Sequence, residues 1–269
     1  MSIPYTEYAV AARQYVTTKK PLTVLLCLLS IVTLAYPSHA DPDHESTTLS
    51  YETGGDNDFD VSMPSTRPDG DLYVAQIAQE GGANINSIPS GWTEITDRDN
   101  GGSIRFATYW KIGSSEPSTY TWGGNSSKKW IGAIHRISGA DASSPIHASG
   151  DTTGDNSSPT APSVTTTVDD CLILRMYGAE GDEQASSYWP SGTTAIFQDD
   201  SAGNVVSAAA YEDLASAGSA GTASFSMTGG KKWVGATIAI APGGGGGTAT
   251  ATVTITRAEP EPTATYNWD

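Results

Sequence analysis

Lys128-Lys-Trp-Ile-Gly-Ala-Ile134 recurs as Lys231-Lys-Trp-Val-Gly-Ala-Thr237, 103 residues (233 − 130) farther along the chain. Aligned segments that keep one order and nearly one offset indicate an internal duplication. Three further pairs keep that order, at offsets of 99, 101 and 105: Asp71-Leu-Tyr-Val-Ala-Gln-Ile-Ala78 with Asp170-Cys-Leu-Ile-Leu-Arg-Met-Tyr177, Ile88-Pro-Ser-Gly91 with Trp189-Pro-Ser-Gly192, and Tyr120-Thr-Trp122 with Phe225-Ser-Met227. The sequence therefore predicts two similar halves.

Each half reads as short strands, because β-prone runs are bounded by turn residues such as Pro-Ser-Gly. Between Ser103 and Ile112, one face carries Ile104, Phe106, Thr108 and Trp110, and we expect a half-buried strand there. A half of four or five strands has an apolar face that must be covered, and its twin is the simplest cover. The predicted fold is all-β: a single β-sandwich, jelly-roll or Greek-key like, made of two similar halves, plus a short C-terminal β tail.

The first 40 residues resemble a secretory signal peptide, with an apolar run from Leu22 to Tyr36 and a small-residue cleavage motif that ends at Ala40. An uncleaved anchor or a buried strand is the alternative. Beyond this segment we expect an N-terminal extension (41–57), the two-half sandwich (58–242), a Gly linker (243–247) and a C-terminal tail (248–269). The connection between the halves, residues 138–168, is rich in Pro, Ser and Thr and suits a surface crossover.

The tail begins Thr248-Ala-Thr-Ala-Thr-Val-Thr-Ile-Thr256, an alternating strand pattern on a glycine tether. Such a segment can add a strand to an open sheet edge of a neighbouring molecule. A disordered tail or a truncated domain is the alternative. The residues that we expect to take part in this assembly are Thr248, Thr250, Thr252, Val253 and Ile255.

With 30 acidic and 14 basic side chains, the net charge of −16 disfavours nucleic acid as a partner. We expect no membrane contact after signal cleavage. Cys27 falls within the signal, so Cys171 is the one cysteine of the mature chain and is expected to be a small core residue. The core must then be held by packing, without an internal disulfide.

Several motifs resemble a β-sandwich module that recurs in bacterial surface proteins and marine phage structural proteins. They are Gly70-Asp-Leu72, Pro89-Ser-Gly-Trp-Thr93, Tyr109-Trp-Lys111, Glu116-Pro-Ser-Thr-Tyr-Thr-Trp122, Ala161-Pro-Ser-Val-Thr-Thr-Thr-Val-Asp-Asp170 and Lys231-Lys-Trp-Val-Gly-Ala236. The resemblance covers about residues 58–242 and implies a passive building block or adhesion unit without catalytic residues. The signal-like N-terminus departs from the phage members and favours an exported cellular protein.

No constellation of residues indicates catalysis, and we predict that the chain is not an enzyme. His44, His135 and His147 lack zinc-binding spacing, and there is no nucleophile elbow or phosphate loop. His135 aligns with Ile238 of the other half, which favours a strand position over a catalytic base. Two groups of acids, Glu94 with Asp97 and Glu180 with Asp182 and Glu183, could serve glycoside hydrolysis only if they faced each other.

No cofactor is expected, and calcium is the one cation with candidate ligands. Asp56, Asp58 and Asp60 alternate as D-x-D-x-D, and Asp151, Asp155 and Asn156 form a second group. Neither has the glycine and distal glutamate of an EF-hand, so a solvated acidic loop is the alternative.

Tryptophan could provide a platform for sugar rings. Trp130 and Trp233 are equivalent, which points to core packing, whereas Trp110 and Trp122 lack aromatic equivalents and are the candidates for a glycan surface. We therefore expect a secreted or cell-surface structural or adhesive subunit that self-associates or joins an appendage. A carbohydrate-binding module and a virion decoration or tail-fibre protein are the alternatives.

Overall fold

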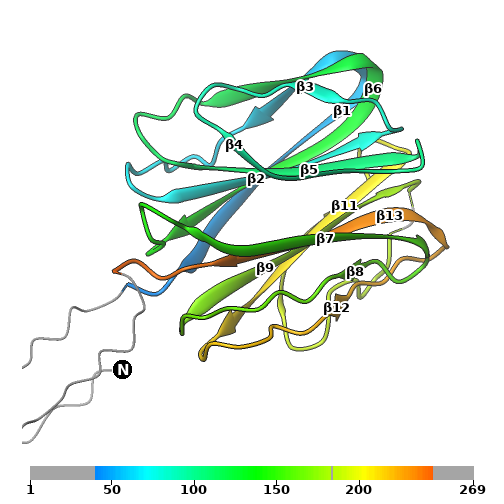
Figure 1. The fold of residues 1–269 in the computed structure, drawn as a ribbon. Coiled ribbons are helices and arrows are strands. Elements are labelled where there is room, and N and C mark those ends of the chain that lie inside the picture. Colours follow the sequence, from blue (N-terminus) through cyan, green and yellow to red (C-terminus); the bar gives the residue numbers. More distant parts are fainter. Residues whose placement is uncertain (1–39, 183, 245–269) are drawn as a thin grey trace, which may run out of the picture. The chain divides into compact units, whose positions relative to one another are not determined.

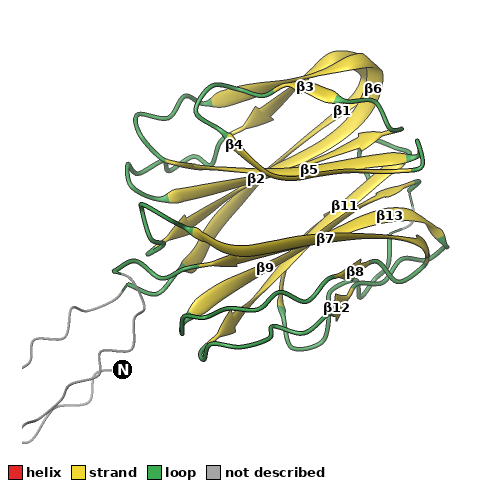
Figure 2. Cartoon of the chain, viewed as in Figure 1, coloured by secondary structure: helices red, strands yellow, loops and turns green. Residues whose placement is uncertain are grey.

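The computed structural model describes residues 40–182 and 184–244, which form strands, turns and loops with no helix (Figure 2). No helix in this part of the chain is therefore long and apolar enough to cross a membrane. The strands are β1 (Asp43–Ser62), β2 (Leu72–Glu80), β3 (Ile85–Ser87), β4 (Thr93–Asn100), β5 (Ile104–Ile112), β6 (Thr119–Ser138), β7 (Ile146–Asn156), β8 (Thr160–Ala161), β9 (Cys171–Glu180), β10 (Thr194–Asp199), β11 (Val205–Leu214), β12 (Ala223–Ser224) and β13 (Lys231–Ile240).

The predicted sandwich of two similar halves is confirmed, and each half forms one antiparallel sheet (Figure 1). The first sheet has the order β1-β6-β2-β5-β4 and the second the order β7-β13-β9-β11-β10. These are the same order when each strand is matched with its counterpart in the duplication. Each sheet is built from one half alone, and the chain passes between the sheets once. The predicted connection of residues 138–168 is wrong in extent, because β7, the edge strand of the second sheet, and β8 lie within it.

The register of the two sheets shows the duplication residue by residue. Trp130 lies opposite Gln79 of β2, and its equivalent Trp233 lies opposite Ala179 of β9. This sets the offset between β2 and β9 at 100 (179 − 79), so the offset of 99 inferred from Asp71 and Asp170 is wrong by one residue. A slip of one residue exchanges the two faces of a strand.

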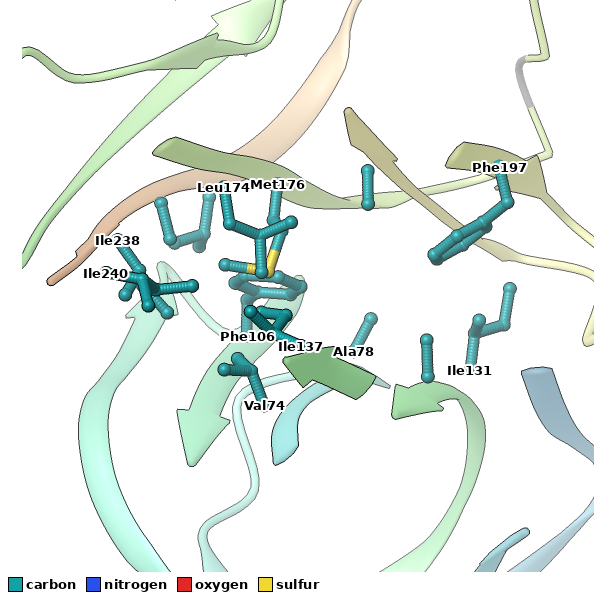
Figure 3. Packing of buried hydrophobic residues seen from close by; sticks show 14 of the residues in the cluster. Val74, Ala78, Phe106, Ile131, Ile137, Leu174, Met176, Phe197, Ile238 and Ile240 are labelled. Atoms are coloured by element: carbon teal, nitrogen blue, oxygen red, sulfur yellow. The ribbon is translucent and has the colours of Figure 1, made fainter. Parts of the chain in front are cut away.

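The main core lies between the sheets, where Figure 3 shows Val74 and Phe106 of the first half pointing toward Leu174 and Met176 of the second. The equivalent residues Ala78 and Gly178 face each other there. A Cβ on Gly178 would lie 3.0 Å from the Cβ of Ala78 and 2.6 Å from Cδ2 of Phe106. The central strands β2 and β9 therefore approach closely, and glycine leaves space for the Phe106 ring.

The outer faces of both sheets are buried too, which corrects the expectation of half-buried strands. On β5, Phe106 packs between the sheets while Ala107 and Tyr109 pack in a second cluster on the outer face. The far halves of β1 and β6 curl over that face and cover it with Phe59 and Trp122. In the second half the short strands β8 and β12 and their loops provide the cover.

This cover explains the repeated Lys-Lys-Trp motif. Trp130 and Trp233 both point to the outer face, and the glycine two residues later shares that face. A Cβ on Gly132 would lie 2.6 Å from the Phe59 ring, and one on Gly235 would overlap the carbonyl oxygen of Thr160. In each half the tryptophan fills the outer cluster and the glycine admits the covering segment.

The boundaries of the folded body differ from the predicted ones. Residues 43–57 belong to β1 and pair with β6, so they are part of the first sheet and not an extension. At the other end Pro242 and Gly243 still form isolated bridges, to Ala140 and Ala40 respectively. Cys171 is buried, as expected. Residues 1–39 and the tail from 245 onward lie outside the described residues.

Candidate functional site: an open sheet edge

The two tryptophans predicted to face solvent do not do so. Trp122 is fully buried in the outer cluster of the first sheet, with its ring centroid 5.3 Å from that of Trp92. Trp110 is half-buried and packs against the core between the sheets. The prediction is wrong for Trp122, because the lack of an aromatic equivalent in the repeat says nothing about exposure when the outer face is covered. The exposed tryptophan of the described residues is Trp189, at 42 %.

The calcium candidates Asp56, Asp58 and Asp60 are exposed and line an open hollow of about 530 Å³ with Asn57 and Ser127. Asp60 accepts a hydrogen bond from the Thr121 hydroxyl. Across the described residues, no group of three or more His, Cys, Asp or Glu side chains is arranged to hold a metal ion. The structure therefore gives the alternating aspartates the geometry of a solvated acidic surface.

One of the acids considered for hydrolysis, Asp97, is held by a basic side chain. Asp97 forms a two-point ion pair with Arg105, with N–O distances of 2.7 and 2.9 Å. Asp151, which belongs to the second group of calcium candidates, pairs with Arg98 at 2.9 Å. Glu183 lies outside the described residues.

A polar cluster that the sequence did not reveal joins β5 to β6. The Lys111 ammonium lies 2.8 Å from Oε1 of Glu116 and donates a hydrogen bond to the Tyr120 hydroxyl at 2.6 Å. That hydroxyl donates to Oε2 of Glu116 at 2.6 Å. Burial alone would raise the pKa of Glu116, but the hydrogen bonds from Lys111, Tyr120 and Ser114 outweigh it and lower the pKa. The three side chains satisfy one another and hold the turn between the strands.

His135 is fully buried in a polar chain that crosses the sandwich. It hydrogen-bonds Thr47 of β1 at 2.7 Å and Gln76 of β2 at 3.0 Å, and Gln76 donates to Ser207 of β11 at 2.8 Å. Burial, and to a smaller extent the nearby His44, holds the pKa of His135 well below its usual value. The histidine occupies the strand position equivalent to Ile238, and its polar contacts fix β1 and β6 against the second sheet.

Four strands form the edges of the two sheets, and three of them are protected against pairing with another chain. Charges, glycines, shortness and register shifts are the usual protections. β7 carries two aspartates and two glycines, and β10 has six residues with a register shift after Ala195. β4 has a register shift after Glu94 and four charged residues: Glu94, Asp97, Arg98 and Asp99.

β1 differs from the other three. Its residues Ser46–Glu52 pair with β6 without a register shift, and the stretch Ser46-Thr-Thr-Leu-Ser-Tyr51 has no charge, glycine or proline. In the part of the chain that the structure describes, no strand pairs with its other side. We call Ser46–Tyr51 the open edge. The open edge lies within the predicted N-terminal extension, although its alternating β-prone residues were the signal that could have identified a strand.

One face of the open edge is partly apolar and exposed. Thr47 points toward the second sheet, because it hydrogen-bonds His135. Leu49 and Tyr51 follow at alternate positions and share that face, and they remain 38 % and 56 % exposed. On the opposite face the Ser50 hydroxyl accepts a hydrogen bond from the Ser62 amide, where the curled end of β1 returns.

The chain leaves the sandwich near the start of this strand. Gly243 forms an antiparallel bridge with Ala40, and its amide donates to the Gly139 carbonyl at 2.6 Å. The predicted assembly residues Thr248, Thr250, Thr252, Val253 and Ile255 lie outside the described residues. The exit of the chain and the open edge are thus at the same end of the first sheet's outermost strand.

Comparisons of the chain with protein-family models, curated proteins and solved structures gave no match. The resemblance to a module of surface and phage proteins therefore stays a prediction.

Proposed function

We propose that this protein is a non-enzymatic structural or adhesive subunit of a cell surface or extracellular appendage, which assembles by adding its C-terminal strand to a neighbouring copy. The observation that carries the proposal is the open edge on an otherwise protected sandwich. An uncharged stretch of edge strand without a register shift is a site for pairing with another chain, and natural proteins usually block such stretches. Export and the surface location rest on the signal-like N-terminus alone.

The test compares the mature chain, residues 41–269, with the same chain lacking residues 248–269. Mass measured by light scattering after size-exclusion chromatography should show oligomers for the first and a monomer for the second, because only the first has a donor strand. Circular dichroism should show the same β-rich fold for both. Oligomers of unchanged size after the deletion would exclude strand addition, and electron microscopy of native material would distinguish filaments from virion-like particles.

Glycan binding is a second candidate, now placed at a different residue. Trp189 is exposed, its ring lies edge-on to that of Tyr188 at 5.2 Å, and the next residue, Pro190, lines an open hollow of about 320 Å³. Exposed aromatic rings of this kind can stack on sugars. A glycan array should then give signals that Trp189→Ala abolishes and Trp110→Ala leaves intact, and silence of the unmodified protein would count against this function.

A further inference from the structure

The open edge of one copy, Ser46–Tyr51, has a pattern that matches the tail of the same protein. β1 alternates Thr47, Leu49 and Tyr51 on the face toward the second sheet with Ser46, Thr48 and Ser50 on the other. The tail from Thr248 to Thr256 alternates alanine, valine and isoleucine with threonine. We propose that residues 248–256 of a second copy pair antiparallel with the open edge and lay Ala249, Ala251, Val253 and Ile255 beside Leu49 and Tyr51.

This inference rests on the proposed function and names the acceptor, the orientation and the partner. Adding a strand on this side would satisfy the outward N–H and C=O groups of β1 and cover the two exposed apolar side chains. The nine residues of the tail strand span about 30 Å, enough to run the length of the open edge.

Charge complements the ends of the pairing. Glu45 and Glu52 flank the open edge, and Arg257, the one basic residue after Gly243, follows the tail strand directly. In an antiparallel pair the end of the tail strand lies near the start of the open edge, where Asp43 and Glu45 are. Glu45 already pairs with Arg136 at 3.2 Å, so Arg257 would join an existing ion-pair network there. An opposite-charge pair at that point favours this register. The charges of β4 leave no uncharged stretch longer than two residues, and the uncharged start of β7, Ile146–Gly150, contains a glycine and a register shift.

The reach of the chain excludes the same molecule as donor in this orientation. Antiparallel pairing puts Thr248 near Glu52, at the far end of the open edge. Glu52 is twelve residues beyond Ala40, about 40 Å along an extended strand. Gly243 is bridged to Ala40, and the five residues from there to Thr248 extend at most about 18 Å. A second copy has no such restriction.

The direction of exit supports the same conclusion. The bridge between Gly243 and Ala40 is antiparallel, so the chain at Gly243 runs opposite to the direction in which β1 departs. Pairing within one molecule would require a reversal inside the glycine run and would be parallel, which is slightly less stable per residue.

The experiment separates the donor from the acceptor. The acceptor variant Leu49→Lys, in the chain 41–269, places a charge on the open edge but keeps the tail. The donor variant lacks residues 248–269 but keeps the edge. Each should be monomeric alone, and an equimolar mixture should form a 1:1 complex, because the first supplies the strand and the second the edge. Sedimentation velocity gives the masses.

The matched control is Thr93→Lys, which adds the same charge to an exposed position of the β4 edge. It should leave the self-association constant within about twofold, whereas Leu49→Lys should weaken self-association at least tenfold. Circular dichroism and tryptophan fluorescence establish that each variant is folded.

The outcomes distinguish this inference from the proposed function. If the deletion gives a monomer but Leu49→Lys still assembles, strand addition stands and the open edge is not the acceptor. If the mixture forms no complex, the acceptor assignment is overturned. If the full mature chain is a monomer whose tail amides resist hydrogen exchange, the tail pairs within its own molecule and the proposed pairing with a second copy is overturned. If the deletion leaves oligomers unchanged, the proposed function itself fails.

Discussion

Gly178→Ala tests whether the two halves meet as closely as the sandwich requires. The added Cβ would lie 2.6 Å from Cδ2 of Phe106 and 3.0 Å from the Cβ of Ala78. Both neighbours are on central strands that pair on each side, so neither strand can move without breaking its register. The backbone at Gly178 is not in the left-handed region, and the cost therefore comes from the contacts alone.

Overpacking of a close-packed core costs about 1–3 kcal/mol. Replacing glycine by alanine at an unstrained position returns about 0.4–1 kcal/mol, because the unfolded chain becomes less flexible. The net expectation is a loss of about 1–2 kcal/mol, or about 2–8 °C in Tm for a domain of this size. Urea unfolding followed by tryptophan fluorescence measures it.

The matched control is Gly150→Ala on β7, where the nearest atoms to the new Cβ are at 3.6 Å, an ordinary contact. It should raise the free energy of unfolding by about 0.4–1 kcal/mol, because no contact opposes the gain from a less flexible unfolded chain. The Phe106 contact is then isolated by a double-mutant cycle. Phe106→Leu removes ring atoms from the contact and should destabilise by about 1–2 kcal/mol alone, but the double variant should be more stable than the sum predicts by about 1 kcal/mol. Additivity within about 0.4 kcal/mol would refute the close approach.

Two further predictions concern buried polar groups. Arg175→Ala should lower the free energy of unfolding by about 3–5 kcal/mol, measured by urea unfolding. The fully buried guanidinium pairs with Glu212 and donates to carbonyls of the covering loops. The control is Arg98→Ala, which should cost less than about 1 kcal/mol because Arg98 is half-exposed. Burial lowers the pKa of His135, so the folded chain takes up a proton on this histidine at lower pH than the unfolded chain does. The contribution of His135 to the free energy of unfolding is therefore intact above about pH 6.5 and should fall by about 1 kcal/mol between pH 7.5 and 5.5. His135→Gln should flatten that pH dependence, and an equally steep profile would assign it to another group.

The duplication made the sandwich predictable, because the repeated tryptophan and glycine are the residues that the fold uses in each half. The residue-by-residue correspondence between the equivalent strands β2 and β9 could not be predicted in the same way. Both strands are buried on both faces, so they show no alternation of polar and apolar residues to align. The offset of 99 came from aligning the turn residues Asp71 and Asp170. These two aspartates are displaced by one residue relative to the strands that follow, and Asp170 adopts a positive φ of 55°. Continuous apolar runs indicate burial on both faces, so the covered outer faces were detectable in principle.

The candidate sites were harder to predict than the fold. The exposure of Trp122 depends on which segments cover the outer face of the first sheet, and that cover comes from the curled ends of β1 and β6. The exposure of Trp110 depends on how the second sheet packs against the inner face. Serine, threonine, two glycines and four aspartates gave β1 the composition of an extension. Only the pairing with β6 shows that this polar segment is an edge strand, and only the comparison of all four edges shows that it is the unprotected one.

The duplication also provides an internal comparison for the open edge. β1 and β7 hold the same place in their sheets, beside β6 and β13. On β7, Asp151 pairs with Arg98 of β4, and a Cβ on Gly150 would meet Pro162 and Val164 of the covering loop at 3.6 Å. β1 has a six-residue uncharged stretch with exposed apolar side chains at the equivalent edge. Since an unprotected edge favours pairing with other chains, the difference between the two halves places the proposed acceptor on the first.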